Sequence, residues 1–337
     1  MRPAPQRHGE SPAANSLPPG KGWKSAHPGI KPKSCGCRSL PCGKRLPGRH
    51  LTVTRPGCGP AALLSFHINP RASMPDISST MRLRLLLAYD GSRYCGWQIQ
   101  DIPTPPPTVQ AAVEAAVGRI AGRPVRVFGS GRTDAGVHAH GQVAHCDVPR
   151  RPGLDWRHAL NALLPADVRV LHWQEAAPDF HARISALRKT YVYDFWQEKG
   201  FVPPRLAPFV WRSGPLDAGA MRAALPFLLG RHDFASFQNA GTEMESTVRE
   251  LQAATLTELP PVEFMPPYLP CLRLTVTANG FLKQMVRNMA GLLAACGRHK
   301  LRPDQIPAIL EAADRRALPS PTAPPQGLAL AHVEYPD

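Results

Sequence analysis

The chain has 337 residues, 43% of them hydrophobic, and carries a formal net charge of +15. Its length suggests about two domains on a prior of roughly 150 residues each. No apolar run approaches the ~18 residues of a transmembrane helix, and the positive charge favours an acidic partner such as nucleic acid or a membrane surface.

Residues 1–80 are predicted to form a disordered, basic leader. They hold 12 of the 40 Lys and Arg residues but only two acids, Glu10 and Asp76, and they lack apolar periodicity. This Pro-, Gly- and Ser-rich composition cannot bury enough surface to offset chain entropy. The leader is an RNA-binding tail, an organellar transit peptide, or the result of a start codon placed too far upstream. We favour the last interpretation, because a strand pattern begins directly after Met81, although Met74 is also a plausible start.

The eight cysteines divide evenly between the leader and the rest of the chain. Those in the leader lack the C-x2-C spacing of zinc sites and any strand or helix pattern around them, which argues against a metal. No secretory signal is visible. The other four are therefore interpreted as reduced thiols of a cytoplasmic protein: Cys95, Cys146, Cys271 and Cys296.

The elements that follow the leader have the order βαββαβ. In the first strand Leu83, Leu85 and Leu87 alternate on one face, and the helix after it begins at a capping Thr108. The remaining predicted elements are strands at 125–128 and 142–148, a helix at 155–164 and a strand at 168–173. This order is that of a ferredoxin-like split motif, which we assign to residues 81–185.

The same order recurs in residues 186–337. The strand at 190–196 carries Tyr191, Tyr193 and Phe195 on one face, and Pro226 is expected to kink the next helix. The other predicted elements are a helix at 217–229, strands at 251–256 and 272–278, helices at 281–296 and 305–313, and a strand at 328–335. We therefore predict an α+β fold of two ferredoxin-like βαββαβ halves, with two antiparallel sheets, helices on one face and a central active-site cleft.

The most unusual segment is 128–140, Phe-Gly-Ser-Gly-Arg-Thr-Asp-Ala-Gly-Val-His-Ala-His. It lies between two predicted strands, and its glycines allow positive φ angles and close approach of a ligand. Arg132 and Asp134 are two residues apart, so both project the same way from an extended segment. A carboxylate beside a guanidinium suits nucleophilic or acid–base chemistry on an anionic substrate. By composition alone, a hairpin loop with a surface ion pair is the more ordinary interpretation.

Residues 131–138, Gly-Arg-Thr-Asp-Ala-Gly-Val-His, resemble the catalytic motif of the bacterial tRNA pseudouridine synthase A family. The resemblance extends over about 83–336, and residues 1–80 match nothing in the family. Supporting segments occur in the same order and at similar spacing: Tyr-Asp-Gly-Ser at 89–92, Gly-Trp-Gln at 96–98, Asp-Phe-His-Ala-Arg at 179–183, Lys-Thr-Tyr at 189–191, His-Asp-Phe at 232–234, Ser-Phe at 236–237, Met-Val-Arg-Asn at 285–288 and Gly-Leu at 327–328. Together these segments are highly specific.

The resemblance implies a homodimeric enzyme, not bound to a membrane, that isomerises uridines at tRNA positions 38, 39 and 40 in the anticodon arm. It places the catalytic role on Asp134 and makes Arg287 the cation that pairs with it. It implies that Arg132 engages the RNA where the target base is displaced. It also implies that Tyr191, in the strand after the domain crossover, stacks on the uracil.

The chemistry of pseudouridine formation agrees with this assignment. The N1–C1′ bond of uridine breaks, the uracil turns, and C5 bonds to C1′; no redox step occurs, so no cofactor is needed. The Asp134 carboxylate can attack C6 or C1′ or remove the C2′ proton, and the sequence does not choose among them. Extruding the target costs a few kcal/mol, and stacking on an aromatic ring is worth ~1–3 kcal/mol. Tyr191 is also a candidate acceptor of the C5 proton.

Each proposed role has an ordinary structural alternative. Arg183 and Lys189 are expected to contact RNA phosphate, or else are solvated surface charges. Tyr191 shares a strand face that is usually core, and Arg287 lies on a helix face where a solvated arginine is usual. Asp90 is interpreted as a turn residue.

Two other functions compete with the enzyme. An RNA-binding module of paired ferredoxin-like units would display aromatic residues in an RNP signature, which no strand carries. A zinc-dependent deaminase would need H-x-E followed by P-C-x-x-C, and only the first occurs, at 332–334. His138, His140 and His145 suggest a metal site, but a loop that becomes a strand would not bring them together. We expect RNA contacts or local hydrogen bonds from these histidines.

Overall fold

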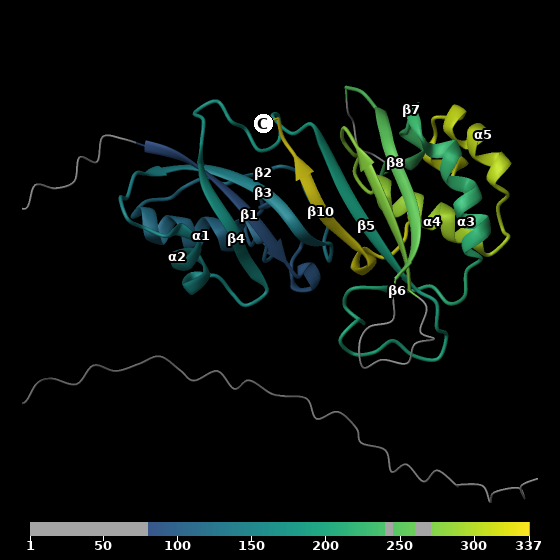
Figure 1. Ribbon diagram of the computed structural model, residues 1–337, viewed down its shortest axis with the longest axis horizontal. Coiled ribbons are helices and arrows are strands. Elements are labelled where there is room, and N and C mark those ends of the chain that lie inside the picture. The colour runs from purple at the N-terminus through teal and green to yellow at the C-terminus, as the bar shows by residue number, and fades with distance from the viewer. Residues whose placement is uncertain (1–79, 240–244, 260–270, 337) are drawn as a thin grey trace, which may run out of the picture. The chain divides into compact units, whose positions relative to one another are not determined.

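The computed structural model describes residues 80–239, 245–259 and 271–336 (Figure 1). All of them belong to one compact unit of the chain, Asn69–Asp337. The predictions for the leader and its cysteines lie outside the described residues, apart from Thr80.

Ten strands form a single sheet in the described part of the chain. The sheet runs in the order β4-β1-β3-β10-β5-β9-β8-β7, with β2 beside β3 and β6 beside β5. Its pairings are antiparallel except β3 with β10 and β5 with β6. The strands are β1 (Thr80–Tyr89), β2 (Phe128–Gly129), β3 (His138–Pro149), β4 (Val168–Ala176), β5 (Arg188–Trp196), β6 (Trp211–Arg212), β7 (Gly230–Asp233), β8 (Val248–Leu259), β9 (Cys271–Ala278) and β10 (Leu328–Glu334).

The prediction of two separate sheets is wrong, because β10 joins the two halves. It pairs in parallel with β3, where Ala329 lies opposite His138 and Leu330 opposite Ala139, and antiparallel with β5. A strand has hydrogen-bonding groups along both of its edges, and an open edge invites unwanted pairing. The last strand therefore covers an edge of each half and makes one sheet of the two that were expected.

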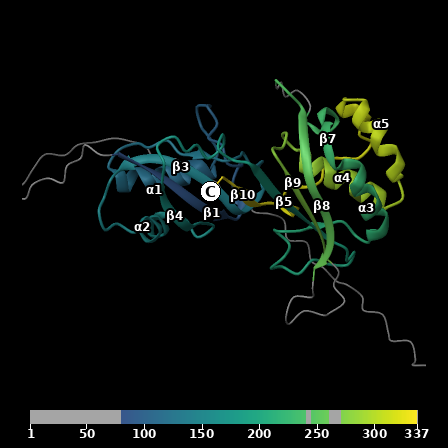
Figure 2. The ribbon, with the colours of Figure 1, turned by 45° about the horizontal axis from the view of Figure 1, so that its top comes forward.

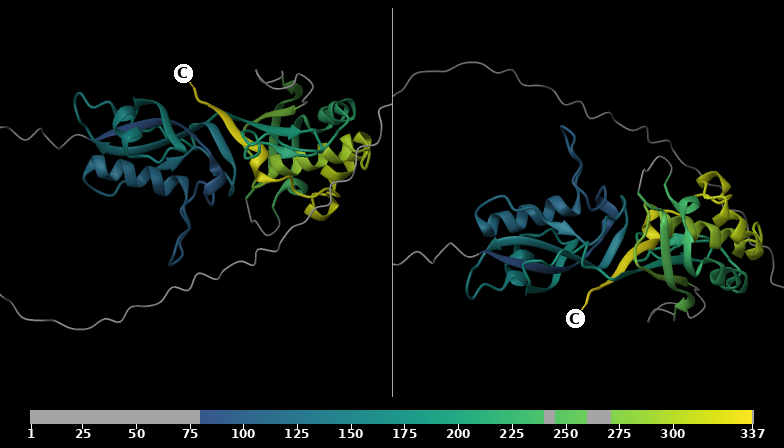
Figure 3. Two further views of the ribbon diagram at one scale, coloured as in Figure 1. Left: turned by 90° about the horizontal axis from the view of Figure 1, so that it is seen from below. Right: turned by 90° about the horizontal axis from the view of Figure 1, so that it is seen from above.

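The helices flank this sheet in two groups. α1 and α2 contact each other beside the strands of the first half, whereas α3, α4 and α5 lie beside those of the second (Figures 2 and 3). No helix in the described ranges is long and apolar enough to cross a membrane. Their bounds are α1 (Val109–Ala121), α2 (Trp156–Leu163), α3 (Ala218–Ala224), α4 (Met285–Gly297) and α5 (Ile306–Glu311).

In the first half, the predicted order of elements is the order in the structure. Leu83, Leu85 and Leu87 are fully buried, as their alternation indicates, and Thr108 caps α1 by accepting the Ala111 N–H. The strand predicted at 125–128 is reduced to the two residues of β2, and the strand predicted at 142–148 is longer than expected and begins at His138.

The backbone of Val127 explains why β2 is so short. Its N–H donates to Glu114 Oε1 and its carbonyl accepts from Gln110 Nε2, at 3.0 and 2.9 Å. Both side chains belong to α1. Because a buried backbone group needs a partner, α1 supplies here what a neighbouring strand would otherwise provide.

The three helices of the second half are shorter than predicted, and α5 covers only Ile306–Glu311 of the expected 305–313. α3 gives way to a 3-10 turn at Leu225–Leu228, because Pro226 has no N–H to continue the helix. α4 begins at Met285 rather than at 281, because Gln284 adopts a left-handed φ of 63°. β6 and β7 are absent from the predicted elements; they have two and four residues.

Candidate active site

Only the middle of the Gly-rich segment 128–140 is a loop, because both of its ends belong to strands. It leaves β2 at Gly129, and β3 already begins at His138. The loop 130–137 between them, here called the Asp134 loop, carries the two charged residues of the motif. Asp134 is half-buried and Arg132 is exposed.

A buried hydrogen-bond network holds the start of the Asp134 loop. Gln142, which is fully buried in β3, accepts the Ser130 hydroxyl at 2.7 Å and donates to the Gly131 carbonyl at 2.9 Å. The hydroxyls of Thr133 and Tyr89 lie 2.8 Å apart. Satisfied polar networks inside a protein rigidify the segments that they join. Sequence analysis missed this role of Gln142; the signal was a polar residue on the core side of a predicted strand.

The segment around Gly96 packs against the middle of the same loop. Trp97 N–H donates to the Thr133 carbonyl at 3.1 Å. A Cβ on Gly96 would lie 2.4 Å from that carbonyl oxygen, and Gly96 has a φ of +88°. Only glycine fits here without strain. Residues 96–98, the Gly-Trp-Gln segment that resembles the family, therefore help to fix the Asp134 loop.

Asp134 and Arg287 meet across the two halves of the chain. Arg287 Nη1 lies 3.1 Å from Asp134 Oδ2, and Arg287 Nε donates to the Ala323 carbonyl at 2.8 Å. The side chains of Arg287 and Asp134 are 13% and 24% exposed. The guanidinium is thus held on one side by a carbonyl and presents its charge to a carboxylate that stays accessible. A solvated arginine, the ordinary alternative for Arg287, is not what the structure has.

Tyr191 lies beside this pair but is largely enclosed. Its side chain is 7% exposed, and its ring meets Phe281 edge-on at 5.1 Å between centroids. A Cβ on Gly131 would lie 3.9 Å from the Tyr191 hydroxyl, so the phenol reaches the Asp134 loop. Burial raises the pKa of the Tyr191 phenol, so it remains protonated at neutral pH.

The three cations predicted to contact RNA lie at or near the same loop. Lys189 lies two residues before Tyr191, on the same face of β5, and donates to the Ser130 carbonyl at 2.5 Å. Burial, with a smaller effect from nearby Arg183, lowers the pKa of Lys189 to about 8. Arg132 and Arg183 are exposed, and no carboxylate among the described residues forms an ion pair with either.

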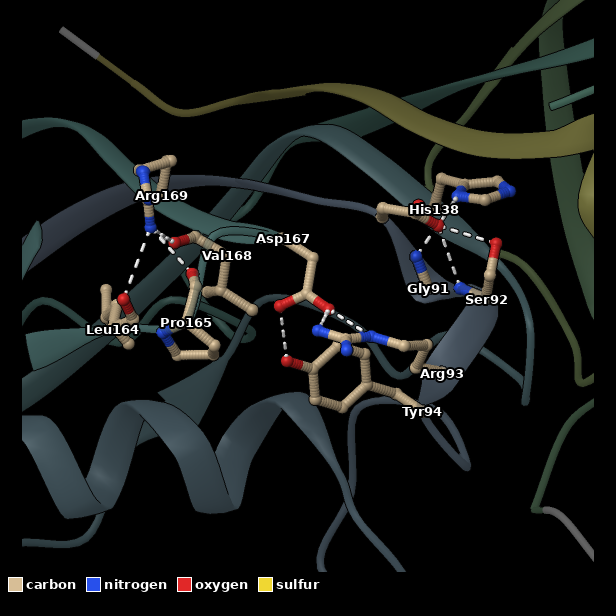
Figure 4. A network of polar contacts seen from close by, with 11 residues as sticks. Gly91, Ser92, Arg93, Tyr94, His138, Leu164, Pro165, Asp167, Val168 and Arg169 are labelled. Atoms are coloured by element: carbon tan, nitrogen blue, oxygen red, sulfur yellow. Dashed lines mark hydrogen bonds and ion pairs between the residues drawn. The ribbon is translucent and has the colours of Figure 1, made fainter. Parts of the chain in front are cut away.

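His138 links the end of the Asp134 loop to two other segments. Its Nδ1 accepts the Gly91 N–H at 3.0 Å (Figure 4). Its Nε2 lies 2.9 Å from the Pro208 carbonyl, to which it must donate. Burial lowers the pKa of His138, so the ring is neutral at pH 7. Asp90, whose Oδ1 accepts the Ser92 N–H, is the turn residue that was expected.

His138, His140 and His145 do not form a metal centre. No group of three or more metal-ligating side chains occurs within the described ranges. His138 makes local hydrogen bonds instead, and His145 Nδ1 accepts the Ala182 N–H at 3.1 Å. The residues 332–334, which spell H-x-E, lie in β10.

A cavity of about 320 Å³ lies on the other side of β5 from Tyr191. Val192, Asp194 and Trp196 line it, and these alternate along the strand with Tyr191, Tyr193 and Phe195. Successive side chains of a strand point to opposite faces of the sheet. The cavity is therefore separate from the Asp134 loop, and its lining includes neither Asp134 nor Arg287.

Comparison with known proteins gives one consistent result. Residues 86–184 and 224–336 match the protein family described as tRNA pseudouridine synthase. The tRNA pseudouridine synthase A of Oleidesulfovibrio alaskensis is 51% identical over 270 residues, which cover 76% of this chain and 97% of that protein. Proteins of the same name from Nitratidesulfovibrio vulgaris and Rhodospirillum rubrum are 49% and 42% identical; the matches cover 75% and 76% of this chain and 99% and 88% of those proteins. The family match contains Asp134 and Arg287, whereas Lys189 and Tyr191 fall between its two ranges.

Proposed function

The chain belongs to the tRNA pseudouridine synthase A family, and we propose that it isomerises uridines at tRNA positions 38, 39 and 40, in the anticodon arm, with Asp134 as nucleophile. It is an isomerase, and the reaction of its family is the conversion of uridine in tRNA to pseudouridine. The observation that carries the proposal for Asp134 is its 3.1 Å contact with Arg287, on a loop that buried hydrogen bonds hold in place.

The proposed reaction needs a positioned carboxylate. The N1–C1′ bond of the target breaks, the freed uracil turns, and C5 bonds to C1′ while C5 loses a proton and N1 gains one. Asp134 attacks C6 or C1′, or it removes the C2′ proton. Arg287 orients the carboxylate through their 3.1 Å charge-assisted contact.

The other site residues have roles around the displaced base. Arg132 is exposed at the loop tip and engages the RNA where the target leaves its stack, a step that costs a few kcal/mol. Tyr191 packs on the uracil with the small part of its ring that is open. We do not assign the C5 proton to Tyr191, because a phenol with a raised pKa must first lose its own proton. Arg183 and Lys189 contact phosphates.

The proposal also covers the architecture and the assembly. The first half has the strand order β4-β1-β3-β2 and the second β10-β5-β9-β8, so corresponding strands occupy corresponding places. We infer from this that residues 81–185 and 186–337 are related, ferredoxin-like halves. We further propose that the enzyme acts on tRNA as a cytoplasmic homodimer, which light scattering of the purified protein tests.

Tritium release tests the function directly. An unmodified tRNA transcript, tritiated at uracil C5, is incubated with the wild type, with Asp134→Asn and with Arg287→Gln. We expect release by the wild type, none by Asp134→Asn, and a rate reduced about 10²- to 10³-fold by Arg287→Gln, as for other lost charge-stabilising groups. Arg316→Gln, which breaks an exposed pair with Asp314, is the matched control and keeps full activity.

Two outcomes would contradict the proposal. Tritium release by Asp134→Asn at the wild-type rate would remove Asp134 from the chemistry. Failure of the folded wild type on several tRNAs would leave a protein that binds RNA without catalysis. Replacing the uridines at 38, 39 and 40 in turn shows whether these positions are the targets.

A further inference from the structure

Phe128 is an exposed aromatic residue directly before the Asp134 loop. It lies in β2, and 45% of it is open to solvent. Its ring stacks on His145, with 5.2 Å between centroids and 21° between planes, and it also contacts His181 at 5.9 Å. One face of the phenyl ring is therefore backed by imidazoles, and the exposed part of the ring is held in a fixed orientation.

The backing of Phe128 is rigid, and the imidazole stacked on it is uncharged. His145 is 3% exposed, and its Nδ1 accepts the Ala182 N–H at 3.1 Å. Burial lowers the pKa of His145 to about 4, so the ring carries no charge at neutral pH. His181 Nδ1 accepts the Arg183 N–H at 3.1 Å, so the second imidazole is fixed by the backbone of the cation beside it.

Two cations without an ion-pair partner lie near Phe128. The backbone N–H of Arg183, an exposed arginine, is bonded to His181, so this cation begins at the cluster. Lys189 binds the carbonyl of Ser130, two residues along the chain from Phe128, and lies near enough to Arg183 to be affected by its charge. Neither cation has an ion-pair partner among the residues that the structure describes.

An open aromatic face beside unpaired cations is the arrangement that binds single-stranded nucleic acid. Every base has a π face that stacks on an aromatic ring, while cations track the phosphates. A second copy of this chain that docked through the same surface would fit less well, because it would bring the same cations against these. We propose that Phe128, backed by His145 and His181 and flanked by Arg183, is a stacking subsite for an unpaired base next to the target uridine.

This inference rests on the proposed function for its substrate but has a binding readout of its own. The Kd for an unmodified tRNA transcript is measured for the wild type, Phe128→Leu and Phe128→Trp. Phe128→Leu is expected to raise the Kd by about 5- to 150-fold, the range of a lost base stack, while Phe128→Trp keeps it. Phe227→Leu, which alters an exposed ring in the 3-10 turn of the second half, is the control and leaves the Kd unchanged.

A second variant tests the cation independently of the ring. Arg183→Gln is expected to weaken binding and to lower the slope of log Kd against log salt by about one, as for one lost phosphate contact. Thermal melting accompanies each variant, and Phe128→Leu is expected to unfold at the wild-type temperature, because the ring is exposed.

The outcomes separate the subsite from the enzyme. An unchanged Kd for Phe128→Leu would overturn the subsite, whatever the activity. Loss of dimer by Phe128→Leu, with RNA binding intact, would overturn it in favour of a contact between copies. If the wild type bound tRNA but released no tritium, the proposed reaction would fail, and the effect of Phe128→Leu on the Kd would still decide the subsite.

Discussion

Lys189 and Arg287 are two cations of one site with different partners. Arg287 is tied to a carbonyl and a carboxylate, so its charge is already committed to Asp134. Lys189 is half-buried and donates to the Ser130 carbonyl, and no carboxylate among the described residues pairs with it, so its ammonium has lost water without gaining an anion. A phosphate oxygen would supply that missing charge, because buried cations are stable only when paired.

Binding of RNA should therefore depend on pH through Lys189. Its pKa is lowered to about 8, chiefly by burial, so the ammonium is present below that pH and is lost above it. We expect the Kd for tRNA to rise about tenfold between pH 7 and 9.5, since a charge-assisted hydrogen bond is worth ~1.5 kcal/mol. Lys189→Gln should bind weakly at both pH values, and Lys189→Arg tightly at both. Equal pH dependence in wild type and Lys189→Arg would assign the effect to another group.

At the scale of elements, amphipathic patterns were the reliable signal. Strand β1 alternates with a fully buried side, and α1 has a capping threonine and Gly122 in a left-handed C-cap, so both are predictable from local sequence. The extent of β2 could not be predicted, because side chains of α1 satisfy the backbone that precedes it. The start of α4 was also missed, because a left-handed Gln284 has no local signature.

Strand β3 is the element that positions the Asp134 loop, and Gln142 is the residue through which it does so. Gln142→Leu removes the partners of the Ser130 hydroxyl and the Gly131 carbonyl, at about 1–3 kcal/mol for each unsatisfied buried group. We expect a lower melting temperature and a rate of tritium release at saturating tRNA that falls about 10- to 100-fold, because a loosened loop misplaces Asp134.

The double variant Ser130→Ala/Gln142→Leu checks the cause. Removing the orphaned hydroxyl should restore part of the stability, so the two effects should not add. Gln174→Leu, which changes an exposed glutamine of β4, is the control for the substitution itself. A full catalytic rate in Gln142→Leu, despite a lower melting temperature, would show that the network serves stability alone.

The site belongs to the whole molecule, because neither half contains it. Asp134 comes from the first half and Arg287 from the second, 153 residues apart. The sequence indicated both residues through family resemblance and both halves through their repeated order. It did not indicate that β10 lies between β3 and β5, because pairing between distant strands leaves no periodic signal in either of them. That strand is what sets the two halves in one sheet.

Gly141 tests whether this junction controls catalysis. A Cβ at Gly141 would lie 2.5 Å from the Ala331 carbonyl oxygen of β10, a contact that only a shift of backbone can relieve. Gly141→Ala should therefore move β10 away from β3 and alter the distance between Asp134 and Arg287. Overpacking of this kind costs about 1–3 kcal/mol, and a misplacement of about 1 Å can lower a rate 10²-fold. We expect the rate of tritium release to fall by about that factor while the Kd for tRNA changes less than threefold.

Gly200→Ala is the matched control, because the nearest atom there is a side-chain carboxylate oxygen of Glu198 at 3.3 Å. If Gly141→Ala melted early but turned over at the wild-type rate, the junction would stabilise the sheet without setting the geometry of the site.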